Sequence, residues 1–203
     1  MRSDDDVRVL SVEVLSDDWY LLKKTTFERR RRDGRWQRMS RETYDRGNGA
    51  TILLYSRRRG SVLLTRQFRF PAFVNDCVDG LLIETCAGLL DNDDAEQCIR
   101  REAEEELGVR IRRPKKLFEA YMSPGSVTEK LHFFAAEYSM ENQIGVGGGL
   151  ATEGEDIEGL ELKLDDALAM MRSGAIQDGK TIMLLQHAQI VGLDGLSGGE
   201  DFP

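Results

Sequence analysis

Short runs that are rich in β-branched residues or that alternate apolar with polar residues dominate the first third of the chain, and each run ends near residues that favour a turn. A period of two is typical of a β-strand with one covered face, and glycine, asparagine and aspartate mark the turns between strands. The pattern therefore predicts antiparallel strands, which we expect at residues 7–16, 18–30, 35–45, 50–56 and 61–69.

The rest of the chain mixes strands with helices. A helix is predicted at residues 93–107, because the acidic cluster at 91–94 can cap its start and Gly108 can cap its end. Apolar residues at helical spacing predict further helices at 164–172 and 181–190. Three more strands are expected at residues 115–122, 130–138 and 158–162.

A glycine-rich stretch at residues 145–156 separates two of these strands and ends in the acids Glu153, Glu155 and Asp156. Glycine leaves the backbone free, and binding or catalytic residues often lie on loops, so we expect a mobile functional loop here. The chain end at residues 192–203 is predicted to be disordered, as terminal residues often are.

Composition and charge exclude several classes of protein. The chain has 203 residues, 40% of them hydrophobic and 32% charged, which suffices for one compact domain with a small subdomain. No apolar run reaches membrane-spanning length, and a net charge of −8 argues against general nucleic-acid binding, which needs a basic surface. We therefore expect a soluble protein that binds neither nucleic acid nor a membrane.

The cysteines and histidines show no metal-binding spacing. Cys77, Cys86 and Cys98 are odd in number, and the N-terminus lacks the apolar core of a signal peptide, so we expect free thiols in a cytoplasmic protein. His132 lies in a predicted strand and His187 in a predicted helix, and we interpret both as structural.

Three glutamates of the helix predicted at 93–107 carry the strongest chemical signal. Glu102, Glu105 and Glu106 stand at positions i, i+3 and i+4, which places their carboxylates on one side of the helix. They repel one another, and negative charge near the end of a helix opposes its dipole. An all-carboxylate site suits Mg²⁺ or Mn²⁺ rather than Zn²⁺, so we expect a divalent cation there; the alternative is a solvated acidic face.

The sequence around these glutamates resembles a known family. Residues 101–109, Arg-Glu-Ala-Glu-Glu-Glu-Leu-Gly-Val, match the second half of the Nudix box at every defined position. The first half departs from that pattern twice: the gap between Gly88 and Arg101 is one residue short, and Asp93 or Asp94 replaces the usual glutamate.

The shortened loop at residues 84–93 closely resembles the GDP-mannose hydrolase branch of the Nudix family. The likeness spans roughly residues 44 to 185, and a match over many separate segments is more specific than a single box. The other matching segments are residues 44–55, 66–69, 121–125, 128–129, 132–134, 147–149, 155–158 and 178–180.

This resemblance implies an α+β fold, the Nudix α/β/α sandwich with a mixed sheet between helices, preceded by a small N-terminal antiparallel sheet. The corresponding domains are an N-terminal subdomain at residues 1–46 and a Nudix hydrolase domain at 47–191, followed by the tail at 192–203. The resemblance also implies a homodimer, in which N-terminal strands exchange between the two copies.

The resemblance further implies a role for individual residues. Glu102, Glu106, Glu155 and the carbonyl of Ala87 would bind the metal, with Glu153 and Asp156 as less favoured substitutes for Glu155. Arg101 would hold the glutamates in position. The implied catalytic residues are Glu102, Glu105, Glu106, Glu155 and Arg101. The implied substrate-binding residues are Trp19, Ser40, Arg41, Glu42, Arg69, Ala87, Gly88, Glu129 and Lys180.

The activity that the resemblance implies is Mg²⁺-dependent hydrolysis of GDP-mannose to GMP and mannose 1-phosphate, with Mn²⁺ as an alternative cation. One rival is an ADP-ribose pyrophosphatase, which shares the box and the loop carboxylate. The other is a catalytically idle module that senses a nucleotide sugar. The intact set Glu102, Glu105 and Glu106 argues against the second rival, because a mere binder has no evident need for a costly acid cluster.

Overall fold

The computed structural model describes residues 6–197, and these form two compact units. One unit combines Met1–Asn48 with Tyr121–Lys130, and the other combines Gly49–Ala120 with Leu131–Pro203. The sequence placed a boundary between residues 46 and 47, but it gave no sign that a later segment joins the N-terminal unit.

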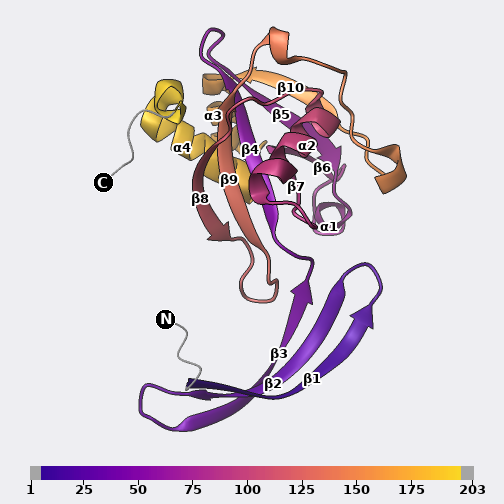
Figure 1. Ribbon diagram of the computed structural model, residues 1–203, viewed down its shortest axis with the longest axis vertical. Helices are drawn as coiled ribbons and strands as arrows, with labels where there is room; N and C mark the ends of the chain where they lie inside the picture. The colour runs from indigo at the N-terminus through magenta and orange to yellow at the C-terminus, as the bar shows by residue number, and fades with distance from the viewer. Residues whose placement is uncertain (1–5, 198–203) are drawn as a thin grey trace. The chain divides into compact units, whose positions relative to one another are not determined.

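The N-terminal unit is a three-stranded antiparallel sheet (Figure 1). Its strands are β1 Val7–Asp17, β2 Leu21–Arg30 and β3 Trp36–Asp45, in the order β1-β2-β3. Residues 121–130 attach to β3 through Tyr44, whose backbone N–H donates to the Ser126 carbonyl at 2.8 Å and whose carbonyl accepts from Thr128 at 3.1 Å. The three strands predicted from alternation are confirmed to within a few residues.

The larger unit contains a seven-stranded mixed sheet. Its main path has the order β10-β5-β4-β9-β8; β4 runs parallel to β9 and antiparallel to β5. The strands are β4 Gly49–Ser56, β5 Ser61–Phe68, β6 Leu81–Glu84, β7 Cys86–Leu89, β8 Lys115–Tyr121, β9 Lys130–Glu137 and β10 Glu158–Lys163.

Strands β4 and β5 pair only at one end, where residues 54–56 meet residues 61–63. Beyond that point one chain segment lies between them: β6 pairs with β5, and β7 then pairs with β4. The segment changes partner at Thr85, which separates β6 from β7. The sheet is therefore opened by an inserted strand.

Helices cover both faces of this sheet (Figure 1). The helices are α1 Phe70–Phe73, α2 Ala95–Leu107, α3 Leu164–Ser173 and α4 Gly179–Leu196. Helix α2 packs on one face, where Ile99 and Ala103 join a core with Ile52 and Leu54 of β4. Every residue of β4 is buried, as expected of a strand covered on two sides. The α/β/α sandwich and the N-terminal antiparallel sheet are thus confirmed.

The structure corrects the sequence at three places. Helix α4 continues to Leu196 across a break at Gly192, so the disorder predicted for residues 192–203 is wrong for the stretch up to Leu196, which is 1% exposed. The remainder, residues 198–203, lies outside the described residues. Helix α1 and the strand pair β6–β7 were not predicted, because segments of four residues are too short to show a period.

Within the described residues, each helix is too short or too polar to cross a membrane.

Candidate active site

Helix α2 is fixed at both ends by its own sequence. The Asp94 side chain accepts hydrogen bonds from the backbone N–H groups of Glu96 and Gln97, and Gln97 completes a capping box. Gly108 ends the helix in the left-handed conformation, with φ of 63°. With the helix limits set in this way, Glu102 and Glu106 turn towards the sheet and both are buried.

Both carboxylates resist ionisation in this position. Burial raises the pKa of Glu102 to about 7; the Arg101 guanidinium opposes the rise, and the carboxylates of Glu105 and Glu155 add to it. Burial raises the pKa of Glu106 to about 8, with further contributions from Glu102 and Glu155. The two glutamates of α2 and Glu155 of the glycine-rich loop therefore share one electrostatic environment.

The Glu102 carboxylate lies directly against the backbone of β7. A Cβ atom on Gly88 would lie 2.0 Å from Glu102 Oε1, so any side chain larger than hydrogen would displace that carboxylate. The neighbouring residue Ala87 pairs with Thr51 of β4 and belongs to the same strand. Ala87, Gly88 and Glu102, three of the residues named by the resemblance, are thus brought together.

Arg101 links α2 to the loop that precedes it. Its Nη1 donates to Glu102 Oε1 at 2.8 Å and lies 3.4 Å from Glu105 Oε2, while its Nη2 donates to the Leu89 carbonyl at 3.3 Å. Its Nε donates to Asp93 at 3.3 Å. Of the two acids that could replace the missing glutamate of the box, Asp93 binds Arg101 and Asp94 caps the helix.

The glycine-rich loop lies on the C-terminal end of α2. The N–H of Gly148 donates to the Glu106 carbonyl at 2.9 Å, and that of Gly149 donates to the Glu105 carbonyl at 3.1 Å. A Cβ atom on Gly147 would lie 2.3 Å from the Glu106 carbonyl oxygen, so the close approach requires glycine. Glu155 is held within the loop, where its carboxylate accepts from the Leu150 N–H at 2.9 Å.

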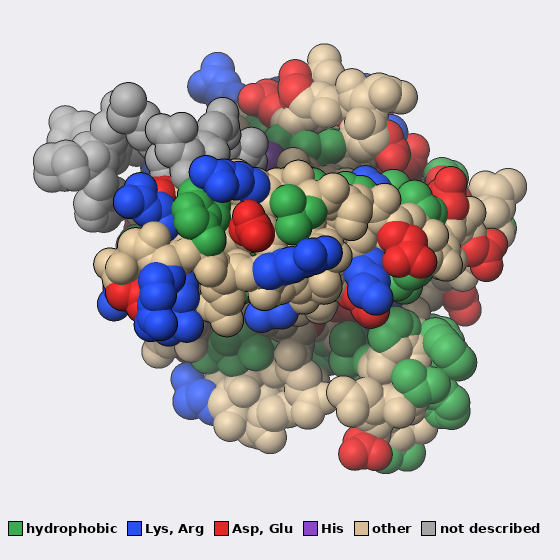
Figure 2. Space-filling view, turned by 90° about the horizontal axis from the view of Figure 1, so that it is seen from below, with side chains coloured by type: hydrophobic (Ala, Val, Ile, Leu, Met, Phe, Trp, Pro, Cys, Tyr) green, Lys and Arg blue, Asp and Glu red, His purple; other side chains and the backbone are tan. Residues whose placement is uncertain are grey.

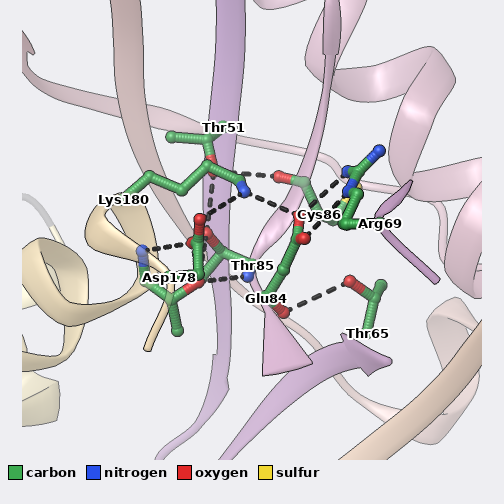
Figure 3. A network of polar contacts seen from close by, with 9 residues as sticks. Thr51, Thr65, Arg69, Glu84, Thr85, Cys86, Asp178 and Lys180 are labelled. Atoms are coloured by element: carbon green, nitrogen blue, oxygen red, sulfur yellow. Dashed lines mark hydrogen bonds and ion pairs between the residues drawn. The ribbon is translucent and has the colours of Figure 1, made fainter. Parts of the chain in front are cut away.

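The cations Arg69 and Lys180 meet on a single buried carboxylate, that of Glu84 (Figure 3). Arg69 donates from Nε and from Nη2 to the two oxygens of Glu84, each at 2.9 Å. Lys180 Nζ donates to Glu84 at 2.7 Å and to Asp178 at 3.0 Å. Burial alone would raise the pKa of Glu84, but the charges of Lys180 and Arg69 outweigh it and lower the pKa to about 2.

The other residues named by the resemblance lie in the N-terminal unit. Ser40, Arg41 and Glu42 of β3 line a hollow of about 340 Å³ together with Lys24 and Gly125. Gly125 belongs to the segment 121–130 that joins this unit.

Trp19 and Glu129 also belong to the N-terminal unit. The Trp19 side chain is 78% exposed, and Glu129 Oε1 lies 3.3 Å from Arg46 Nε. The predicted site residues are therefore divided between the two units.

Sequence reasoning assigned no role to Glu84, Asp178 or Cys86. Glu84 and Asp178 each open a segment that carries the family resemblance, which was the signal available for them. Cys86 is fully buried, and burial together with the nearby Glu106 carboxylate raises the pKa of its thiol. His187 packs edge-on against Phe118 at 5.7 Å between ring centroids, as a structural residue does.

The acid cluster fits a cation, although within residues 6–197 no three His, Cys, Asp or Glu side chains are already grouped as metal ligands. Glu106 Oε2 is buried, and no described residue hydrogen-bonds it. An orphaned carboxylate oxygen beside two further carboxylates is costly unless a positive group joins it. The donor set is all oxygen, which suits a hard divalent cation.

Comparison with family models divides the chain in two. A model described as the GDP-mannose pyrophosphatase NudK N-terminal domain matches residues 6–44, and the NUDIX domain model matches residues 45–185.

Comparison with individual proteins gives a similar result. The chain is 57% identical over 181 residues to a GDP-mannose pyrophosphatase of Yersinia enterocolitica, covering 89% of this chain and 94% of the relative. It is 51% identical over 196 residues to a GDP-mannose pyrophosphatase of Klebsiella pneumoniae, covering 97% of each. A solved structure titled as an ADP compounds hydrolase superimposes with a TM-score of 0.69 at 14% identity, covering 95% of this chain and 99% of that one.

Proposed function

The chain belongs to the NUDIX family of hydrolases, and from this premise we propose that it hydrolyses GDP-mannose at the phosphoanhydride bond to give GMP and mannose 1-phosphate. The observation that carries the proposal is the buried pair Glu102 and Glu106, whose raised pKa values and unsatisfied oxygen call for a cation beside β7. The NudK-type N-terminal match supports the choice of substrate.

We propose Mg²⁺ as the cation, with Mn²⁺ as an alternative. Glu102, Glu106, Glu155 and the Ala87 carbonyl are the groups that would hold it. A bound metal ion would neutralise part of the phosphate charge and would lower the pKa of the attacking water. Arg101 orients Glu102 and Glu105 and ties them to the loop before α2, so the carboxylates keep their geometry when a ligand binds.

Arg69 and Lys180 are proposed to bind the phosphates. Both stay charged at neutral pH: burial opposes the charge of each, but the carboxylates around them outweigh it and raise the pKa of both groups. Arg69 offers a planar fork and Lys180 a point charge, two donor types that suit phosphate oxygens.

We further propose that Trp19, Ser40, Arg41, Glu42 and Glu129 recognise the rest of the substrate. The protein is proposed to be a homodimer in which Trp19 and residues 40–42 serve the partner's site. The support is the exposed apolar surface of β1, an edge strand with Val9 63% and Val12 56% exposed. Figure 2 shows several groups of apolar side chains, in green, on the same face as charged side chains, in blue and red.

ADP-ribose is the rival substrate, and the solved ADP compounds hydrolase shares the fold. Incubation with Mg²⁺ and a panel of nucleotide sugars, followed by chromatography of the products, decides between them. We expect kcat/KM for GDP-mannose to exceed that for ADP-ribose by at least about tenfold. Equal or reversed preference would make the enzyme an ADP-ribose pyrophosphatase, and binding without any product would make it a sensor.

A further inference from the structure

Glu84 is a buried carboxylate to which the reaction outlined above gives no task. Its side chain is 2% exposed, and it lies at the end of β6, just before the strand changes its partner from β5 to β4. Three parts of the chain meet on it: β6, Arg69 in the position after the end of β5, and the first turn of α4 through Lys180 (Figure 3).

The bonds to Glu84 leave donors on both cations. Arg69 uses Nε and one N–H of Nη2, so Nη1 takes no part in its bond to Glu84. Lys180 has three N–H groups and uses two of them, on Glu84 and Asp178. The Arg69 side chain is 41% exposed and that of Lys180 is 12% exposed. The pair can therefore offer further N–H groups to one anion without breaking its own contacts.

The two cations would not stay together without a negative partner. Burial and, to a smaller extent, the Arg69 charge disfavour the charged form of Lys180, but the carboxylates of Glu84 and Asp178 together outweigh them, so the pKa of Lys180 is raised. Burial disfavours the charged form of Arg69, but the carboxylates of Glu84, Glu106 and Asp178 outweigh burial, so the pKa of Arg69 is raised. Glu84 thus allows two like charges to lie close together beside the site where phosphates are proposed to bind.

Hydrogen bonds to neighbouring side chains hold the backbone around Glu84 in place. Thr65 Oγ1 donates to the Glu84 carbonyl at 3.2 Å, and the next N–H, that of Thr85, donates to Thr181 Oγ1 at 2.6 Å. Asp178, which binds Lys180, also caps α4 by accepting from the Thr181 N–H at 2.9 Å. Hydrogen bonds therefore hold the end of β6, which carries Glu84, against the first turn of α4, which carries Lys180.

We propose that Glu84 is a positioning residue, which holds Arg69 and Lys180 as one preorganised phosphate-binding pair. The proposal rests on the proposed function for the identity of the ligand, a phosphate ester. A purely structural ion network would instead only tie β6 to α4, and Arg69 would bind phosphate equally well with or without Glu84.

The test uses Glu84→Gln, which keeps the shape and removes the charge. The first measurement is kcat with GDP-mannose and Mg²⁺. We expect kcat to fall at least about tenfold, because Arg69 and Lys180 are no longer held in the positions that bind the reacting phosphate. The matched control is Glu137→Gln, which breaks an arginine–carboxylate fork with Arg57 elsewhere in the same unit. We expect the control to keep kcat within about twofold of wild type.

The second measurement is a double-mutant cycle on the binding of inorganic phosphate. Calorimetry in the presence of EDTA measures the affinity of each variant for phosphate. Arg69→Met should weaken phosphate binding in the wild-type background. In the Glu84→Gln background Arg69 is no longer aligned, so the fold loss of phosphate affinity caused by Arg69→Met should be at least about threefold smaller. Should Glu84→Gln fail to fold, Glu84→Asp replaces it in both measurements, since the shorter acid keeps the charge but cannot reach both cations.

An equal Arg69→Met penalty in the two backgrounds overturns the positioning role, as does a Glu84 variant with kcat within about twofold of wild type. The phosphate cycle needs no turnover. If the wild type leaves GDP-mannose intact, the proposed function fails while the cycle still decides the role of Glu84.

Discussion

Glu106 is the residue of α2 on which the proposed metal site most depends, since it is buried among carboxylates and one of its oxygens is unsatisfied. We predict that Glu106→Gln lowers kcat by about a thousandfold, equivalent to about 4 kcal/mol of transition-state stabilisation. The matched control is Glu104→Gln on the same helix, because Glu104 instead pairs with Arg110 at 3.0 Å. Steady-state kinetics with Mg²⁺ check this, and a Glu106 variant with more than about half of wild-type turnover would remove α2 from the active site.

Glu84 also makes stability depend on pH. Its pKa is lowered from 4.5 to about 2 in the folded chain, so its contribution, of order 3 kcal/mol, is complete above about pH 5 and is lost as the pH falls towards 2. We predict that wild type is more stable than Glu84→Gln at neutral pH, and that the difference shrinks between about pH 5 and pH 2. Urea unfolding at a series of pH values measures it. A difference that stays constant down to about pH 3 would contradict the charge-based explanation.

At the scale of elements, the glycine-rich loop has two halves. Gly148 and Gly149 are bonded to the end of α2, whereas the following residues, with the short 3₁₀ helix Ala151–Glu153, bond mainly among themselves. We predict that amides of residues 150–156 exchange faster than those of 148–149 in the free protein, and that Mg²⁺ with a non-hydrolysable GDP-mannose analogue slows them. Hydrogen exchange with mass spectrometry measures both states.

The same loop makes a kinetic prediction for Glu155. Glu155→Gln should lower kcat more than it weakens substrate binding, because the carboxylate is needed at the reacting phosphate rather than at the base or sugar. Glu141→Gln, on the separate 3₁₀ turn Met140–Asn142 and at an exposed position, is the control. Unchanged exchange of residues 150–156 together with a near-normal kcat for Glu155→Gln would reduce the loop to a linker.

At the scale of the whole molecule, the proposed site draws residues from two units, with Arg41 in one and Glu106 in the other. If the N-terminal unit serves the partner's site, mixing inactive Arg41→Ala and Glu106→Gln dimers should restore about a quarter of wild-type activity, because half of the dimers are hybrids with one intact site. Mixing Glu102→Gln with Glu106→Gln should restore none, since both changes lie in the same unit. A monomer in light scattering, or no recovery after subunit exchange, would contradict the shared site.

Helices and strands with local signals could be predicted from the order of the amino acids. Helix α2 could be placed because Asp94, Gly108 and the spacing of Glu102 and Glu106 all lie within one short segment, and a helix converts spacing directly into a shared face. The long strands followed from alternation for the same reason. Through the family resemblance, the sequence also named the residues of the proposed site.

Contacts between residues that are distant in the chain became visible only in the folded protein. Arg69 and Lys180 looked like two independent phosphate ligands in the sequence, yet they share Glu84, which is 15 positions from one and 96 from the other. No local period encodes such a contact, because it forms only when β6 is inserted beside β5 and α4 closes on the sheet. The strand that changes partner at Thr85 and the buried state of Glu106 are likewise products of packing, since burial and strand pairing depend on chain segments far away in sequence.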